Sequence, residues 1–178
     1  KEIAKAARVA QIPMWNAYYF FTLYANAEGY QAKEVSGSSE AIDNYILSKL
    51  KRLSRIVKQG LDTYDVALSC NEVASFMEIL NNWYIRRTRD RFWSGDQQAF
   101  DVLYTVLVNL SKIMAPLMPF LCEYVYKNLT GGESVHLADY PQLENIKLDE
   151  TLVDEMDFLQ DLWVANTELK LPRDLPKI

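Results

Sequence analysis

Histidine, cysteine, glycine and proline are scarce in this 178-residue chain, which has one, two, six and six of them. His136, the single histidine, lies in a segment with no helical pattern. We interpret it as a structural or surface residue rather than a catalytic base. With one histidine and no CxxC motif, the sequence disfavours a zinc site, and we expect no metal ligands. So few glycines and prolines argue against disorder and against an all-β fold with many turns.

Motifs that hold phosphate groups are absent as well. The sequence contains neither a GxxxxGK[ST] loop nor a GxGxxG motif, so neither common phosphate cradle is present. The acidic residues are dispersed, and no pair of them stands out as an acid and base couple. The residues of the chain therefore predict no catalytic site and no bound cofactor.

Long apolar runs are also missing, and none approaches the length that spans a bilayer. Cys70 and Cys122 occupy apolar positions of helix-like patterns, and we expect buried free thiols in a cytoplasmic protein. The chain starts with Lys-Glu-Ile and stops at Leu-Pro-Lys-Ile without a closing element. We expect it to be a fragment of a longer protein.

Helical periodicity dominates what is present. Apolar residues make up 49% of the chain and recur three and four positions apart. Helices are predicted over residues 1–27 with a disturbance at Pro13, 40–61, 65–93, from a cap at Asp96 to Pro116, 120–129 and 149–166. The clearest stripe is Val66, Cys70, Val73, Met77, Leu80 and Tyr84. In the helix after Asp96, one face carries Leu103, Val106, Leu110 and Ile113, and the helix at 120–129 is expected to end at Gly131-Gly132. The chain is therefore predicted to be an all-α antiparallel helix bundle at 1–142. Residues 143–178 are predicted to form a short, partly irregular C-terminal appendage with one helix, in which Leu152, Met156, Leu159 and Trp163 share a side.

Positive charge is concentrated in NNWYIRRTRDRFW, residues 81–93, although the chain as a whole has formal net charge -5. If 66–93 is one helix, Arg86 and Arg89 share a face, and Arg87 and Arg91 form a second line. The acidic residue in the cluster, Asp90, is placed to pin one of them. The candidate RNA-binding side chains here are Arg86, Arg87, Arg89, Arg91, Trp93 and Trp83.

Two readings account for these side chains. Cations near a helix C-terminus stabilise the helix dipole by about 0.3–1 kcal/mol each when exposed, which explains one or two arginines better than four. Guanidinium groups also bind phosphate, and indole rings stack on unpaired bases for about 1–3 kcal/mol per base. The sequence favours RNA contact for the arginines, while both tryptophans also suit packing against the helix.

A second basic face is predicted on the helix at 40–61, opposite its apolar stripe. Its candidate residues are Lys51, Arg52, Arg55 and Lys58. A solvated helix surface explains them most simply, and an RNA-facing surface is the competing reading.

Five segments resemble, in order and spacing, the anticodon-binding domain of isoleucyl-tRNA synthetases, which are class I aminoacyl-tRNA synthetases. The most specific of them is residues 81–93. The others are Trp15-Asn16 with 18–21, DNYILSKL at 43–50, MAPLMPFLCEYVYKNL at 114–129 and ESVHLADYP at 133–141. The resemblance covers residues 1–165, roughly, and no function is carried onto 166–178.

The resemblance implies a parent enzyme that attaches isoleucine to its tRNA using ATP and magnesium and that edits in a separate domain. Its catalysis depends on HIGH and KMSKS motifs, and neither occurs here. This chain is therefore expected to be non-catalytic and to grip the anticodon stem and loop. Its implied partners are isoleucine-accepting tRNA and the rest of the synthetase chain, in the cytoplasm and without a membrane.

Two alternatives stay open. The proline-containing segment at 114–129 is shared by valyl and leucyl relatives, so the chain could be the corresponding domain of either enzyme. A helical protein-interaction module, with its arginines on an acidic partner, is the reading from another class. The resemblance does not say which arginines meet bases and which meet phosphates.

Overall fold

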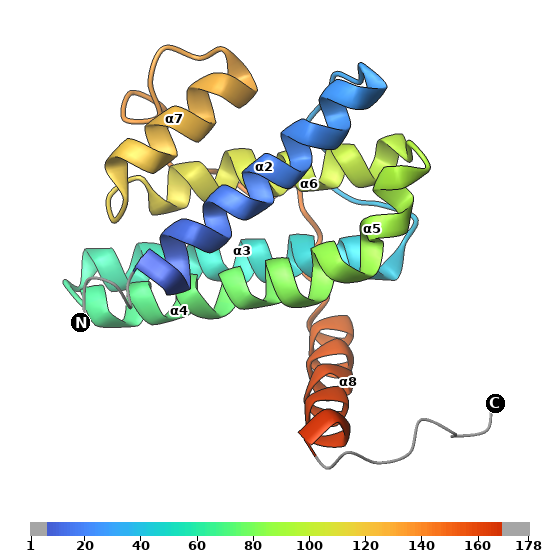
Figure 1. The fold of residues 1–178 in the computed structure, drawn as a ribbon. Coiled ribbons are helices and arrows are strands. Elements are labelled where there is room, and N and C mark those ends of the chain that lie inside the picture. Colours follow the sequence, from blue (N-terminus) through green and yellow to red (C-terminus); the bar gives the residue numbers. More distant parts are fainter. Residues whose placement is uncertain (1–6, 169–178) are drawn as a thin grey trace, which may run out of the picture.

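The computed structural model describes residues 7–168, which contain helices and connecting turns but no strand (Figure 1). The all-α prediction is confirmed. In chain order the elements are the π-helix η1 (Ala7–Gln11), α2 (Ile12–Glu28), α3 (Ala41–Asp62), α4 (Val66–Glu78), the π-helix η2 (Ile79–Ile85), α5 (Arg86–Trp93), α6 (Gln97–Met114), α7 (Pro119–Thr130) and α8 (Glu150–Glu168).

The central element is α6, against which α2, α3 and α7 pack (Figure 1). Its predicted stripe of Leu103, Val106, Leu110 and Ile113 is fully buried. Most of its remaining side chains are buried too, because neighbouring helices cover it from several sides. Along one side of this core, α3 and α4 form an antiparallel pair.

Local signals mark the ends of several helices. Asp96 caps α6, since its carboxylate accepts hydrogen bonds from the amides of Gln98 and Ala99 at 2.9 and 3.4 Å. Pro119 lies in the first turn of α7, where its missing N–H costs nothing. The helix ends at Gly131, whose φ of 69° is in the left-handed region that glycine tolerates. Near Pro13 the backbone changes from η1 to α2, at the predicted disturbance.

The helix predicted over 65–93 is helical from Val66 to Trp93, but it is not a uniform α-helix as the spacing implied. The π-helix η2 separates α4 from α5, and its wider turn shifts the phase of every residue that follows. The first residues of the predicted apolar stripe are not buried, since Val66 is 50% exposed and Cys70 is exposed. Helical spacing predicts a face but not how far neighbouring elements extend along it. Cys122 is buried as predicted, and burial raises the pKa of its thiol to about 12.

The last element, α8, runs away from the bundle (Figure 1). Its first turns pack on α3, with Val153 fully buried, whereas Leu159 and Trp163 are 50% and 57% exposed. The predicted apolar side of this helix therefore joins the core only in part. The division into 1–142 and 143–178 stays a prediction. Over the described range, 7–168, no helix is both long and apolar enough to cross a membrane.

Candidate nucleic-acid interface

The arginine cluster is held by buried residues on η2 and α5. Tyr84 and Phe92 are completely buried, and Ile85 nearly so. Phe92 packs edge-on against Phe20 of α2 and Phe100 of α6, with ring centroids 5.0 and 5.2 Å away. These anchors fix the rotation of α5 and so determine which arginines face outward.

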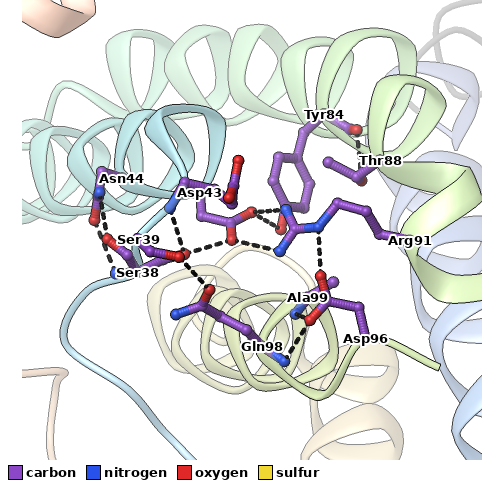
Figure 2. Close-up of polar contacts among 11 residues, drawn as sticks. Ser38, Ser39, Asp43, Asn44, Tyr84, Thr88, Arg91, Asp96, Gln98 and Ala99 are labelled. Carbon is purple, nitrogen blue, oxygen red and sulfur yellow. Dashed lines mark hydrogen bonds and ion pairs between the residues drawn. The ribbon is translucent and has the colours of Figure 1, made fainter. Parts of the chain in front are cut away.

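Arg91 faces into the fold (Figure 2). Its Nη1 and Nη2 atoms donate to the two carboxylate oxygens of Asp43 at 2.9 and 3.0 Å, and its Nε donates to Asp96 at 2.7 Å. Asp43 is fully buried and also accepts hydrogen bonds from the hydroxyls of Tyr84 and Ser38. Arg91 thus joins α5 to the start of α3 and the cap of α6.

The pKa values around Arg91 reflect this network. Burial alone would lower the pKa of Arg91, but its hydrogen bonds to Asp43 and Asp96 outweigh burial and raise it. Burial would raise the pKa of Asp96, yet the bond from Arg91 and the two capping amides lower it. Burial, followed by the charge of Asp43, raises the pKa of Tyr84 well above its ordinary value. The guanidinium of Arg91 is thus held by the carboxylates of Asp43 and Asp96 within the fold, so Arg91 is a structural residue.

The side chains of Arg86, Arg87 and Arg89 are exposed. Arg87 lies between two indoles, since its guanidinium carbon is 3.6 Å from the ring centroid of Trp83 and 5.0 Å from that of Trp163. Burial, followed by the charge of Arg86, lowers the pKa of Arg87. An arginine keeps its charge despite such a shift. The two rings therefore hold a cationic, planar donor group in place.

Trp83 is packed rather than open, with 7% of its surface exposed. Its Nε1 atom is buried and has no hydrogen-bond acceptor among residues 7–168. Such an unsatisfied donor costs on the order of 1–3 kcal/mol. Without bound RNA, Trp83 therefore packs against the guanidinium of Arg87 and does not offer an exposed ring for stacking.

Trp93, at the other end of α5, is 57% exposed. Its Nε1 atom donates to the hydroxyl of Tyr24 on α2 at 2.6 Å, and Arg89 lies 5.7 Å from its ring. Arg89 and Trp93 form a second exposed pairing of a guanidinium with an indole.

A cleft of about 600 Å³ opens where η2 and α5 face the end of α8. Its lining combines arginines, tryptophan rings and two side-chain amides that can donate and accept hydrogen bonds. Its lining residues are Glu78, Asn82, Trp83, Arg86, Arg87, Gln160, Trp163 and Val164. Trp163, Gln160 and Asn82 were not among the predicted site residues, because no local spacing connects α8 with the arginine cluster.

The second basic face is only partly exposed. Lys51 is 7% exposed, and its ammonium group donates to the backbone carbonyls of Glu144 and Ile146. The prediction that Lys51 lies on the outer face of the helix is therefore wrong, because its ammonium group binds the segment before α8. Arg52, Arg55 and Lys58 are exposed, with Lys58 paired to Asp62 at 2.8 Å.

His136 is exposed, in line with a surface role. Within the part of the chain that the structure describes, no three histidine, cysteine, aspartate or glutamate side chains are grouped to hold a metal ion. The arrangement on η2, α5 and α8 offers positive charge, hydrogen-bond donors and ring surfaces. These groups suit the binding of an RNA strand.

Comparison with known proteins agrees with this chemistry. A family model described as the anticodon-binding domain of tRNA ligase matches residues 43–178. An isoleucine–tRNA ligase of Leifsonia xyli subsp. xyli is 42% identical over 175 residues, which cover 95% of this chain and 16% of that protein. The enzyme of the same name from Corynebacterium efficiens is 42% identical over 173 residues, 96% of this chain and 16% of its own. That of Bifidobacterium longum is 40% identical over 189 residues, with coverages of 94% and 17%. The chain thus spans about one sixth of the length of these relatives.

Proposed function

Because this chain belongs to the family of anticodon-binding domains of tRNA ligases, we propose that it binds the anticodon stem and loop of a tRNA. The observation that carries the proposal is the exposure of Arg86, Arg87 and Arg89 beside Trp93 and Trp163 in an otherwise acidic chain. Guanidinium groups bind phosphate and base edges, and indoles stack on unpaired bases. Arg91 is left out of the binding set because its donors are used within the fold.

The tRNA in this proposal is the isoleucine-accepting one, and the chain is part of a cytoplasmic isoleucine–tRNA ligase. The relatives named above carry that name and are 40% to 42% identical to this chain over the aligned residues. A ligase of this kind also needs ATP and magnesium. This chain has no phosphate-binding motif, and residues 7–168 hold no grouped metal ligands, so we assign both to the rest of the parent chain.

A filter-binding titration tests the proposal. The chain is titrated with transcripts of isoleucine, valine and leucine tRNA at two salt concentrations. Tighter binding of isoleucine tRNA, weakening as salt rises, is the expected result because phosphate contacts release counterions. A preference for valine or leucine tRNA would instead assign the chain to that relative.

Equal binding of all three transcripts would remove the isoleucine assignment and leave a general tRNA-binding surface. Absence of binding by this chain and also by the full-length parent would overturn tRNA recognition. It would favour the competing reading, in which the arginines meet an acidic protein.

A further inference from the structure

The helix α2 is apolar on its outer side as well as on the side that packs into the bundle. Its inward residues, among them Met14 and Phe21, are buried. Four large apolar side chains, spaced three and four positions apart, share the outer side. They are Ile12, Trp15, Tyr19 and Leu23, and each is between 43% and 58% exposed. Residues 9–27 include no charged side chain, although charged residues make up 24% of the whole sequence.

The helix α7 continues this surface. Phe120 and Tyr124 lie one turn apart on α7 and are 90% and 50% exposed. The ring centroids of Tyr124 and Trp15 are 5.8 Å apart, so the exposed side chains of the two helices meet. Both helices lie at the outside of the bundle (Figure 1). We call this surface the aromatic face, and its residues are Ile12, Trp15, Tyr19, Leu23, Phe120 and Tyr124.

The chemistry of the aromatic face is that of a protein contact. Contiguous exposed apolar surface marks places where proteins interact. The cores of such contacts are rich in aromatic side chains and poor in charged ones. A helix that is apolar around most of its circumference is typical of the interior of a large protein. The outer side of α2 is therefore suited to burial against another folded surface.

RNA fits this face poorly. An RNA strand needs cations beside its phosphates, and residues 9–27 provide none. On α7, Lys127 is paired with Glu123 at 3.9 Å. The aromatic face thus offers rings without partners for phosphate, in contrast to the exposed arginines of α5.

The length of the relatives indicates the occupant. This chain spans 16% to 17% of the isoleucine–tRNA ligases that it matches, so about five sixths of a ligase of that length lies outside it. A domain on the same chain is present at an effective concentration on the order of 1 mM, which keeps even a modest contact closed. We propose that the aromatic face docks this domain on an apolar, uncharged surface of the rest of its parent ligase. This inference rests on the proposed membership of a longer ligase and is independent of tRNA binding.

Hydroxyl-radical footprinting tests the proposal, because it labels exposed aromatic rings and is read residue by residue by mass spectrometry. The chain by itself and the full-length parent are labelled without RNA. Trp15, Tyr19 and Tyr124 are expected to react strongly in the chain alone. In the parent their labelling is expected to fall to the level of Tyr84, which is completely buried in the bundle. Tyr64, which is 91% exposed between α3 and α4, is expected to keep its labelling.

Tyr19→Glu provides a second measurement. A carboxylate at this exposed position is solvated in the chain alone, so the urea midpoint of the chain is expected to stay unchanged. In the parent, docking would remove water from the same carboxylate, so Trp15 and Tyr124 are expected to regain the labelling that they have in the chain alone. Tyr64→Glu is the matched control and is expected to leave both rings protected in the parent. Continued protection in Tyr19→Glu would place Tyr19 outside the contact and overturn the proposal.

Three other results would also overturn it. Equal labelling of the aromatic face in the chain and in the parent would show that the parent does not cover this face. Protection in the chain alone, together with sedimentation as a dimer, would assign the face to a second copy. Protection of Tyr19 and Tyr124 by tRNA added to the chain alone would assign it to RNA. Failure of the chain to bind tRNA would remove the proposed function but leave the protection in the parent, so the two failures are distinct.

Discussion

At the scale of single residues, the four arginines of 81–93 have different tasks. Arg91 forms ion pairs with the buried carboxylate of Asp43 and with Asp96. Arg87 is held between two indoles, and Arg86 and Arg89 face outward. Four like charges in one stretch are compatible with folding because one is neutralised inside the structure and the others remain solvated.

Replacing Arg91 by alanine is expected to destabilise the fold by about 3–5 kcal/mol, because the buried carboxylate of Asp43 would lose its charged partner. Urea unfolding measured at neutral pH provides the value. Arg89→Ala is the control, and for this exposed position the change is expected to stay within about 0.5 kcal/mol. Equal midpoints for the two variants would show that the Arg91 network contributes nothing.

Asp96 makes part of this stability pH-dependent. The pKa of its carboxylate is below the ordinary value of 3.8 in the folded chain, so the folded state binds its proton less readily than the unfolded state. Its contribution is therefore complete well above pH 3.8 and is lost as the pH falls through the lowered value.

Asp96→Asn keeps a helix cap but cannot ionise. The variant is expected to be less stable than the unsubstituted chain at pH 7, and the gap is expected to close as the pH falls below 3.8. Urea unfolding of both proteins at several pH values measures this difference. A gap that stays constant down to pH 2 would contradict the proposed ion pair.

At the scale of elements, the π-helix η2 organises the site. It directs Tyr84 to Asp43 and leaves Trp83 beneath Arg87. π-Helical turns are rare and often occur at functional sites. Here the changed phase lets α5 bury Phe92 and turn Arg91 inward while three arginines remain outside.

Leu80, in η2, is completely buried. Leu80→Ala is expected to cost about 2–5 kcal/mol, because it removes apolar contacts and leaves a cavity. The same substitution at Leu68, which is 36% exposed at the start of α4, is expected to cost about 0.5 kcal/mol. Chemical denaturation of the two variants compares them directly, and an unshifted midpoint for Leu80→Ala would place this residue outside the core.

The other decisive element is α8, which a polar clamp fastens to α3. Asp157 accepts from the hydroxyl of Tyr45 at 2.6 Å and from the ammonium of Lys49 at 2.9 Å. Burial, followed by the hydrogen bond to Asp157, raises the pKa of Tyr45. Trp163 lies beyond the clamp on the same helix, so its place near Arg87 depends on how α8 is held.

Asp157→Ala is therefore expected to loosen α8 without unfolding the bundle. Hydrogen exchange should accelerate over 150–168 and stay unchanged in α6, because only the contacts with α3 are removed. Asp154→Ala, at an exposed position of the same helix, serves as the reference. Equal protection of α8 in both variants would mean that apolar packing alone holds this helix.

At the scale of the whole molecule, charge is segregated in a chain of net charge -5. Three exposed arginines, Arg86, Arg87 and Arg89, lie close together on α5, while carboxylates are frequent along α8. An RNA strand responds to the local field more than to the total charge. An acidic protein is therefore compatible with RNA binding at one face, and the affinity is expected to depend strongly on salt.

Arg87→Ala and Arg89→Ala are each expected to weaken tRNA binding by about 10- to 150-fold, the value of one charge-assisted hydrogen bond. Each is also expected to reduce the slope of log affinity against log salt by about 0.7 if the lost contact is to a phosphate of the loop. Filter binding at four salt concentrations gives both quantities.

Lys127→Ala is the control, because Lys127 is an exposed cation on α7. It is expected to bind like the unsubstituted chain. The assignment of Arg87 and Arg89 to RNA contact fails if both variants also bind unchanged, or if both unfold.

The sequence by itself determined the all-α class, the predicted ends of α3 and α7 and the buried stripe of α6. These follow from spacings of three and four residues and from local signals such as Asp96 and Gly131. Apolar patterning indicated the inward face but overestimated the burial of Cys70 and Trp163. The resemblance of 81–93 indicated where the candidate interface lies.

Only the tertiary structure decided which arginine is structural and which residues complete the cleft. Arg91 meets Asp43 at a separation of 48 residues, and Arg87 meets Trp163 from a helix that spacing does not relate to it. Periodicity predicted that Lys51 faces solvent, but its ammonium group is buried because it donates hydrogen bonds to carbonyls of the segment before α8. Periodicity describes one helix at a time, whereas a charge or a ring acquires its role from the helices packed against it.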